Sequence, residues 1–122
     1  MPDSKILVVD DDEALLRVIS LSLFLEDDCS VETARDGIEA LERVTSDTFD
    51  LVILDLSMPR MDGRTFFREL RARGHRMPVV ILSAYGAESA RQELEAEAAI
   101  SKPFDPDLLL EKIKPLLSQR GA

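Results

Sequence analysis

The chain has 122 residues, of which 45% are hydrophobic and 32% are charged, a balance typical of one folded globular domain rather than a disordered segment. Its formal net charge of −9 argues against nucleic acid or an anionic membrane as a direct partner, because both would repel it. No apolar run reaches the ~18 residues that a membrane helix needs, and the acidic start is not expected to act as a signal peptide. The single cysteine, Cys29, fits a reducing compartment, so we expect a cytoplasmic protein.

In chain order, the first half predicts a strand, a helix, a strand, a helix and a strand. The strands are short runs rich in Val, Ile and Leu, whereas the helices carry apolar residues every three or four positions. An aspartate at the start of each helix is expected to cap its first turn. The predicted elements are strands Lys5–Val9, Ser30–Ala34 and Leu51–Leu54, a helix capped by either Asp11 or Asp12 with an apolar stripe of Leu15, Ile19 and Leu23, and a helix from Asp36-Gly37 through Leu41 and Val44.

The second half continues this alternation after a Met58-Pro59 turn. A proline within the last predicted helix, Pro115, is expected to kink or end it, because proline removes one backbone hydrogen bond. The predicted elements are a helix from Asp62-Gly63 that buries Phe66 and Leu70 and ends at Gly74, strand Pro78–Leu82, a helix over roughly 86–95, strand Ala98–Ser101, and a helix from Asp105-Pro106 through Leu109 and Ile113.

Strands that alternate with helices predict an α/β fold, a parallel sheet covered by helices on both faces. The Val, Ile and Leu runs agree, since such strands are buried on both sides. Ligands bind such sheets at the carboxyl ends of the strands. Four of the strands end in polar residues, which are therefore expected to meet at one edge of the sheet: Asp10 and Asp11, Asp55, Ser83 and Lys102.

Three carboxylates at one edge would repel one another by about 4 kcal/mol per pair at ~4 Å and an effective dielectric near 20. Such a cluster is expected to hold a cation, and oxygen ligands suit Mg²⁺. Lys102 and Ser83 add a positive charge and a hydroxyl donor, both suited to a phosphoryl group. Asp55 is then a candidate nucleophile that forms an aspartyl phosphate. Each residue alone has an ordinary explanation, such as a helix cap or a surface lysine, and only their joint occurrence favours a site.

The segments VVDDDE, DLSMPRMDG, LSAYG and SKPFD, in this order, resemble the receiver domain of two-component response regulators over about residues 4 to 118. The resemblance implies one receiver domain over residues 1–122, with a flavodoxin-like, doubly wound sheet of five parallel strands in the order 2-1-3-4-5. It also implies transfer of a phosphoryl group from a phosphohistidine of a sensor histidine kinase or histidine phosphotransfer domain. A downstream effector or tethered output domain would read the change, and a homodimer on activation is a further implied state.

The resemblance assigns a role to each acidic residue of the predicted site. Asp55 is the phosphoacceptor. Asp11, Asp55 and the backbone carbonyl of Ser57 would bind Mg²⁺ directly, whereas Asp10 would act mostly through water. The chain would assist its own phosphorylation and dephosphorylation, yet it would be a signalling module and not an enzyme that turns over a foreign substrate.

Ser83 and Lys102 would contact the phosphoryl group, and the bond before Pro103 would be cis. Ser83 and Tyr85 are the switch candidates, with Tyr85 expected either beside the phosphoryl site or packed over the fourth helix. The chain departs from the family pattern beyond Ser83: the usual aromatic residue three positions before the lysine is Ala99, the fourth helix is about one turn short, and Glu95-Ala96 replaces the usual Gly-Ala. We therefore expect the fourth helix to be the least stable element and to carry the signal.

Three other functions fit the sequence less well. An aspartate-nucleophile phosphatase usually has a second acid two residues after the nucleophile, where this chain has Ser57, and it needs a cap for which the chain lacks length. A calcium-binding loop of the form D-x-[DN]-x-[DN]-G is not present after the first strand. A receiver fold used only for binding would not need the full set of Asp11, Asp55, Ser83 and Lys102.

Overall fold

The computed structural model describes residues 4–27, 29–58 and 61–121, in which five strands and five helices alternate. The predicted Met58-Pro59 turn includes Pro59, which lies outside these residues. Two strands differ by one residue from the predictions, so that Asp55 and Ser83 are the last residues of their strands. The strands are β1 (Lys5–Val9), β2 (Ser30–Ala34), β3 (Leu51–Asp55), β4 (Val79–Ser83) and β5 (Ala98–Ser101), and the helices are α1 (Glu13–Asp27), α2 (Gly37–Ser46), α3 (Gly63–Ala72), α4 (Ala87–Leu94) and α5 (Pro106–Gly121).

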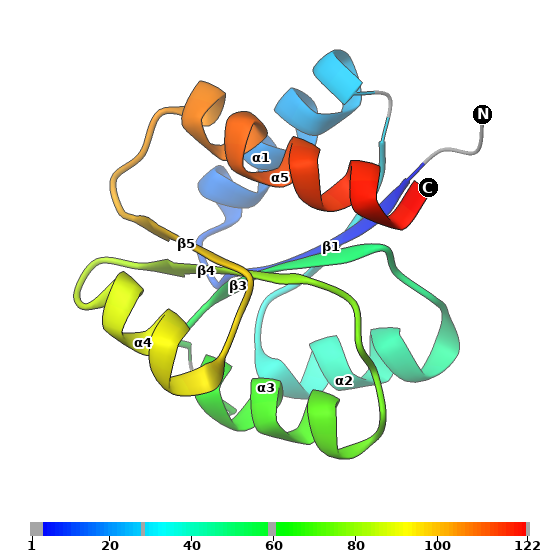
Figure 1. Cartoon of the computed structure of the whole chain (residues 1–122), viewed down its shortest axis with the longest axis vertical. Coiled ribbons are helices and arrows are strands. Elements are labelled where there is room, and N and C mark those ends of the chain that lie inside the picture. The colour runs from blue at the N-terminus through cyan, green and yellow to red at the C-terminus, as the bar shows by residue number, and fades with distance from the viewer. Residues whose placement is uncertain (1–3, 28, 59–60, 122) are drawn as a thin grey trace.

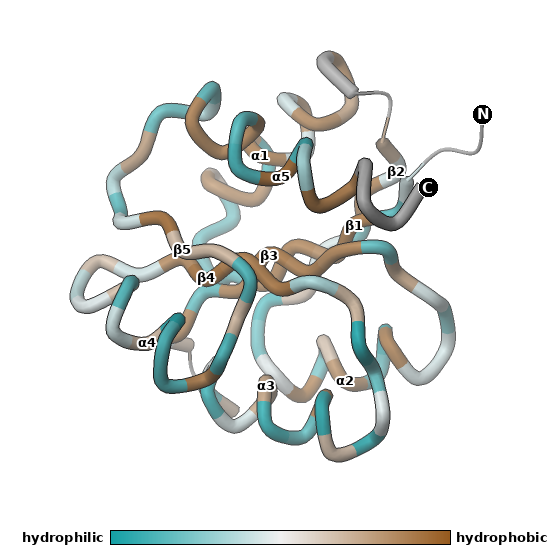
Figure 2. The backbone as a smooth tube through the Cα atoms, viewed as in Figure 1, coloured by the Kyte–Doolittle hydropathy of each residue, from teal (hydrophilic) through white to brown (hydrophobic). Residues whose placement is uncertain are grey.

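The five strands form one parallel sheet in the order β2-β1-β3-β4-β5, which confirms the predicted fold class and strand order. The central strands β3 and β4 are buried along their whole length. They are the hydrophobic band that crosses the middle of Figure 2. Burial on both faces explains why these strands are continuous apolar runs rather than alternating ones.

Helices cover both faces of the sheet (Figure 1). α1 and α5 lie on one face, where Ile19, Leu23 and Ile113 belong to one buried cluster. α2, α3 and α4 lie on the other face, where Phe66 and Leu70 belong to a second cluster. No helix within the described segments is both long and apolar enough to cross a membrane.

Aspartates begin α1, α2, α3 and α5, as predicted. Asp36 caps α2, Asp62 caps α3 and Asp105 caps α5, each by accepting a backbone hydrogen bond at 2.9 Å. At α1 the cap is Asp12, whose side chain accepts from Ala14 at 3.0 Å. The choice that the sequence left open is therefore resolved, and the Asp11 carboxylate is not used for capping.

The ends of two helices test the predictions based on glycine and proline. Gly74 follows α3 in a left-handed conformation, with φ of 90°, and its amide donates to the carbonyl of Arg71 at 3.0 Å, as expected for a helix end. Pro115 lies inside α5, which continues to Gly121, so of the two predicted outcomes, a kink or the end of the helix, the second is wrong. Leu116 and Leu117 pack against the core beyond the proline, and this packing offsets the lost backbone hydrogen bond.

Candidate functional site

The register of the parallel strands brings the predicted polar residues to one edge of the sheet. Val9 of β1 is level with Leu54 of β3, so Asp10 and Asp55 end neighbouring strands at the same height. Ser83 and Ser101 are level on β4 and β5, so Lys102 follows directly beyond Ser83. Asp10, Asp55 and Ser83 are buried, whereas Asp11 in the loop after β1 is exposed.

Asp10, Asp11 and Asp55 form a cluster in which each offers one oxygen atom within 4.8 Å of the others. Within the described residues it is the one group of three or more His, Cys, Asp or Glu side chains close enough to share a metal ion. All of its donors are carboxylate oxygens, and two of its three members are buried. This donor set suits a hard divalent cation such as Mg²⁺.

Asp10 is held by the protein itself. Its Oδ1 accepts a hydrogen bond from the backbone of Asp12 at 3.0 Å, and its Oδ2 accepts one from Lys102 Nζ at 2.8 Å. Its own amide donates to the carbonyl of Ala34 on β2 at 3.0 Å. With both oxygens engaged, Asp10 acts as a fixed negative charge beside Asp55.

Asp55 has one engaged oxygen and one open oxygen. Lys102 Nζ lies 3.3 Å from Oδ1, and the amide of Ser57 lies 3.5 Å from the same atom. Across the described part of the chain, no donor contacts Oδ2. Burial, followed by the charge of Asp10, raises the pKa of Asp55 above its ordinary value, although Lys102 acts in the opposite direction. The charge of the buried Asp55 carboxylate is therefore incompletely compensated by Lys102.

Lys102 bridges two of the carboxylates. Burial alone would lower the pKa of its ammonium group, but the hydrogen bond to Asp10 and the charges of Asp10 and Asp55 raise it above the ordinary value. Lys102 is consequently a cation at neutral pH. The bond between Lys102 and Pro103 is cis, as the resemblance implied.

The Ser83 hydroxyl points into its own loop. It donates to the carbonyl of Tyr85 at 2.7 Å and accepts from the amide of Tyr85 at 3.2 Å. The Tyr85 side chain is 90% exposed, so the alternative in which it packs over the fourth helix is wrong for this structure. A hydroxyl engaged in this way must leave the Tyr85 backbone before it can donate to a group on Asp55.

The fourth helix is capped in an unusual way at both ends. Gly86 precedes it in a left-handed conformation and provides no side-chain cap, and Glu95 follows it with φ of 60°. A non-glycine residue in this conformation is strained, because its Cβ crowds the backbone. Glu95 therefore takes a conformation that glycine would adopt without strain. Ala99, level with Ile81 of β4, is partly buried and packs against the core, where its methyl group fills little space.

A second feature lies away from the carboxylates. A groove of about 740 Å³ runs between α1 and the edge strand β2, and it contains none of the predicted site residues. Beside it, the outer face of α1 exposes Leu21, Phe24 and Leu25, each by more than half of its surface. The residues that line the groove are Glu13, Leu16, Arg17, Ser20, Leu21, Phe24, Thr33, Arg35 and Glu39.

Comparison with known proteins gives one consistent result. The family model of the response regulator receiver domain matches residues 6–114. Response regulators named MprA are 40% identical over 116 residues, both in Mycobacterium avium (strain 104) and in Mycobacterium tuberculosis (strain ATCC 25618 / H37Rv). The match covers 93% of this chain but 50% of each relative, so the chain spans about half the length of these curated relatives.

Solved structures agree with the sequence matches. The receiver domain of the Francisella response regulator 1452 superposes with a TM-score of 0.88 at 30% identity, covering 97% of this chain and 99% of that one. The chemotaxis response regulator CheY4 of Vibrio cholerae superposes with a TM-score of 0.86 at 31% identity, covering 94% and 99%.

Proposed function

The chain belongs to the response regulator receiver domain family, and from this premise we propose that it accepts a phosphoryl group on Asp55 from a phosphohistidine of a sensor histidine kinase or a histidine phosphotransfer protein. One observation carries the proposal: Lys102 Nζ lies 3.3 Å from Oδ1 of the buried Asp55, whereas among the described residues no donor contacts its Oδ2. The proposed unit is a single receiver domain over residues 1–122, with its core at about residues 4 to 118.

In the proposed step, Oδ2 of Asp55 attacks the phosphorus atom of the phosphohistidine. The new P–O bond forms as the P–N bond breaks. The electron pair of the P–N bond stays on the imidazole nitrogen, which takes up a proton. Nucleophilic attack requires the ionised carboxylate, and Lys102 contacts Oδ1, which leaves Oδ2 for the attack. The Lys102 ammonium also offsets the negative charge that gathers on the phosphoryl oxygens.

Receiver domains generally bind Mg²⁺ at an acidic pocket, and the carboxylate cluster of this chain fits that ion. Asp11, Asp55 and the carbonyl of Ser57 would hold it, with Asp10 acting through water. The ion would neutralise charge on the carboxylates and on the phosphoryl oxygens. Asp10 contributes separately, because its hydrogen bond fixes Lys102.

Phosphorylation is proposed to act as a signal rather than as a step in the turnover of a foreign substrate. The same site would assist hydrolysis of its own aspartyl phosphate. Ser83 would leave the Tyr85 backbone and donate to the phosphoryl group, and this change would reach α4, which starts at Ala87. A downstream effector or a tethered output domain would read the altered face, alone or in an activated homodimer. A cytoplasmic location belongs to the same proposal, supported by the single buried Cys29.

A protein phosphodonor also needs a surface to dock on, and we assign this role to the outer face of α1. α1 begins at Glu13, two residues after Asp11, and it exposes Leu21 and Phe24 beside the groove. A helical phosphodonor can bury such apolar residues. Phe24→Lys should then slow transfer from a phosphohistidine protein but leave labelling by acetyl phosphate unchanged, because the small donor needs no docking surface. Equal slowing with both donors would contradict this assignment.

The proposed function is tested by incubating the protein with acetyl phosphate and Mg²⁺. The chain should gain one phosphoryl group that is released by hydroxylamine, as expected for an acyl phosphate. Asp55→Asn should take no label, whereas Asp50→Asn, a change of the same kind just before β3, should be labelled at the parental rate. Labelling of Asp55→Asn at the parental rate would overturn the proposal.

A further inference from the structure

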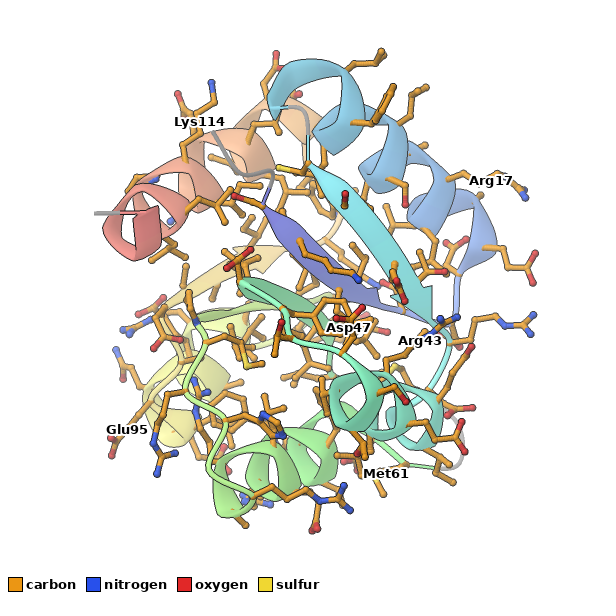
Figure 3. The ribbon with its side chains drawn as sticks, turned by 90° about the vertical axis from the view of Figure 1, so that its right-hand side faces the viewer. Arg17, Arg43, Asp47, Met61, Glu95 and Lys114 are labelled. Carbon is orange, nitrogen blue, oxygen red and sulfur yellow. The ribbon has the colours of Figure 1, made fainter. Side chains whose placement is uncertain are left out.

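The loop that follows Asp55 is held by two glycine amides. Gly63, the first residue of α3, donates its N–H to the carbonyl of Leu56 at 3.0 Å, at the start of the loop. Gly37, the first residue of α2, donates its N–H to the carbonyl of Met61 at 3.0 Å, near the end of the loop. Figure 3 shows Met61 beside α2, although the loop joins β3 to α3.

Neither glycine leaves room for a side chain. A Cβ atom at Gly63 would lie 2.4 Å from the carbonyl oxygen of Asp55 and 2.7 Å from Cα of Leu56, distances that real Cβ atoms essentially never show. A Cβ at Gly37 would lie 2.8 Å from the carbonyl oxygen of Met61 and 2.7 Å from its Cγ. Neither glycine has a positive φ, so the requirement is for space and not for an unusual backbone conformation.

The two contacts differ in how easily they can be relieved. Both nearest atoms at Gly63 belong to the backbone, and one of them is the carbonyl of Asp55 itself. A methyl group at position 63 must therefore displace either β3 or the start of α3. At Gly37 one of the three nearest atoms is Cγ of Met61, which can rotate away, although the carbonyl oxygen and Cβ of Met61 also lie within 3 Å. Substitution of Gly63 should consequently disturb Asp55 more than substitution of Gly37.

We infer that Gly63 is a positioning residue, and that Gly37 supports it: together they fix the Asp55 carboxylate and the loop containing Ser57 at the distance from Lys102 and Asp11 that the site needs. This inference rests on the proposed function. Asp62 strengthens the arrangement, because its side chain accepts a hydrogen bond from Thr65 at 2.9 Å and fixes the first turn of α3. Reacting groups tolerate little misplacement, and an error of about 1 Å can reduce a rate about 100-fold.

A glycine with room for a side chain would lead to the opposite prediction. Without a steric conflict, Gly→Ala at the start of a helix raises stability, because alanine restricts the unfolded chain and favours helix. Gly74→Ala supplies the matched control at the other end of α3. A Cβ at Gly74 meets nothing within 4 Å, but its φ of 90° strains any other residue, so this change should lower the melting temperature without touching the site.

The test compares Gly63→Ala, Gly37→Ala, Gly74→Ala and the parent chain at a temperature at which circular dichroism shows each of them folded. For each, the Mg²⁺ dissociation constant and the rate of phosphorylation by acetyl phosphate are measured. We expect Gly63→Ala to weaken Mg²⁺ binding and to slow phosphorylation, each by about 10-fold or more. Gly37→Ala should have a smaller effect of the same kind, about threefold, and Gly74→Ala should stay within about twofold of the parent despite its lower melting temperature.

Several results would overturn the inference. One is a folded Gly63→Ala with parental Mg²⁺ binding and rate, and another is a Gly74→Ala that loses as much as Gly63→Ala. If Gly63→Ala does not fold, the inference is tested with Gly37→Ala instead. A parental Mg²⁺ dissociation constant and a parental phosphorylation rate for Gly37→Ala would then contradict the inference. A parent chain that binds Mg²⁺ but takes no label refutes the proposed function instead, and the Mg²⁺ constants still decide on the two glycines.

Discussion

At the carboxyl end of the sheet Lys102 contacts Asp10 and Asp55, and at the amino end Lys5 contacts Asp47 and Glu32. At each end one lysine therefore contacts two carboxylates, and at the amino end Arg43 adds a second cation 3.0 Å from Glu32. The side chains of Asp10 and Asp55 are 0% and 5% exposed, whereas those of Asp47 and Glu32 are 41% and 34% exposed. The two sites share a lysine between two carboxylates, and they differ in burial and in the additional charge beside them: Arg43 at the amino end and Asp11 at the carboxyl end.

This difference reverses the direction of the pKa shifts. Burial and the charge of Asp10 raise the pKa of Asp55, whereas the hydrogen bond from Lys5 lowers the pKa of Asp47. In water the lysine satisfies its carboxylates, and the charges at the amino end form an ordinary, screened surface network. In the interior one lysine does not compensate the neighbouring carboxylates, and Asp11 adds a further negative charge. Burial, together with the third carboxylate, therefore favours a bound cation at the carboxyl end, whereas the exposed carboxylates at the amino end already contact Lys5 and Arg43.

The largest expected effect is a difference in phosphorylation rate between substitutions of Lys102 and of Lys5. Lys102→Ala removes a cation that would face the transferred phosphoryl group, so the rate of phosphorylation by acetyl phosphate should fall by about 100-fold or more. Lys5→Ala makes the same change at the amino end and should leave the rate within about twofold. Both rates are measured by intact-mass spectrometry at saturating Mg²⁺. Equal rates in the two variants would remove the distinction between the two ends.

A second prediction concerns the cation. Mg²⁺ that binds only the folded chain should stabilise it by about 2.7 kcal/mol at one hundred times its dissociation constant. Asp11→Asn should lose most of this gain, whereas Asp47→Asn at the amino end should keep it. Thermal unfolding with Mg²⁺ and with EDTA measures the difference. A gain of the same size in both variants would locate the bound ion elsewhere.

The third prediction concerns α4. This helix starts near the carboxyl edge of the sheet, after Ser83, and ends near the amino edge, where the amide of Glu97 donates to the carbonyl of Val79. Glu95, labelled in Figure 3, occupies a left-handed position that glycine would fill without strain. Glu95→Gly should therefore stabilise the chain by about 1 kcal/mol, as measured by urea unfolding. Destabilisation by Glu95→Gly would show that its conformation is not strained.

Hydrogen exchange with and without beryllofluoride, a phosphoryl mimic, sharpens this third prediction. We expect protection to change most across residues 85–100, because Ser83 must release the Tyr85 backbone. Lys5 and Asp47 at the amino end should keep their protection. Changes confined to α1 and α2 would show that the signal leaves by another face.

The smallest expected effect is in the pH titration of the metal-free chain. Asp55 should titrate above the ordinary range of aspartates and Asp47 below it. For Asp55 the raised pKa means that the folded chain holds its proton more tightly, so this contribution to stability is lost as pH rises through the folded pKa. For Asp47 the contribution is present above the unfolded pKa and is lost as pH falls through the folded one. Carbon-detected NMR of the carboxyl groups measures both, and shifts in the same direction would contradict the comparison.

Much of the fold was predictable, because parallel strands buried on both faces leave a clear sequence pattern. The same pattern predicted the meeting of Asp10, Asp55, Ser83 and Lys102, since the carboxyl ends of neighbouring strands share one edge. The choice between Asp11 and Asp12 as the cap of α1 was not predictable, because either residue type can cap a helix. It depends on which carboxylate reaches the amide of Ala14.

Other features depend on contacts through space. Pro115 suggested the end of a helix, yet packing of Leu116 and Leu117 keeps α5 continuous. The orientation of the Ser83 hydroxyl toward Tyr85 has no signature in the sequence. Gly63 looked like an ordinary residue at a helix start, and only the position of the Asp55 carbonyl, 2.4 Å from its would-be Cβ, shows why a side chain does not fit.

The central claim is that the open oxygen of Asp55, at the buried end of the sheet, receives the phosphoryl group. It is tested most directly by treating the phosphorylated protein with borohydride, which reduces an aspartyl phosphate to homoserine, and then locating the homoserine by peptide mass spectrometry. We predict homoserine at position 55 alone, dependent on Mg²⁺ and not formed in Asp55→Asn. Homoserine at position 10, 11 or 47 in place of 55, or a phosphorylated chain with no homoserine, would contradict the claim.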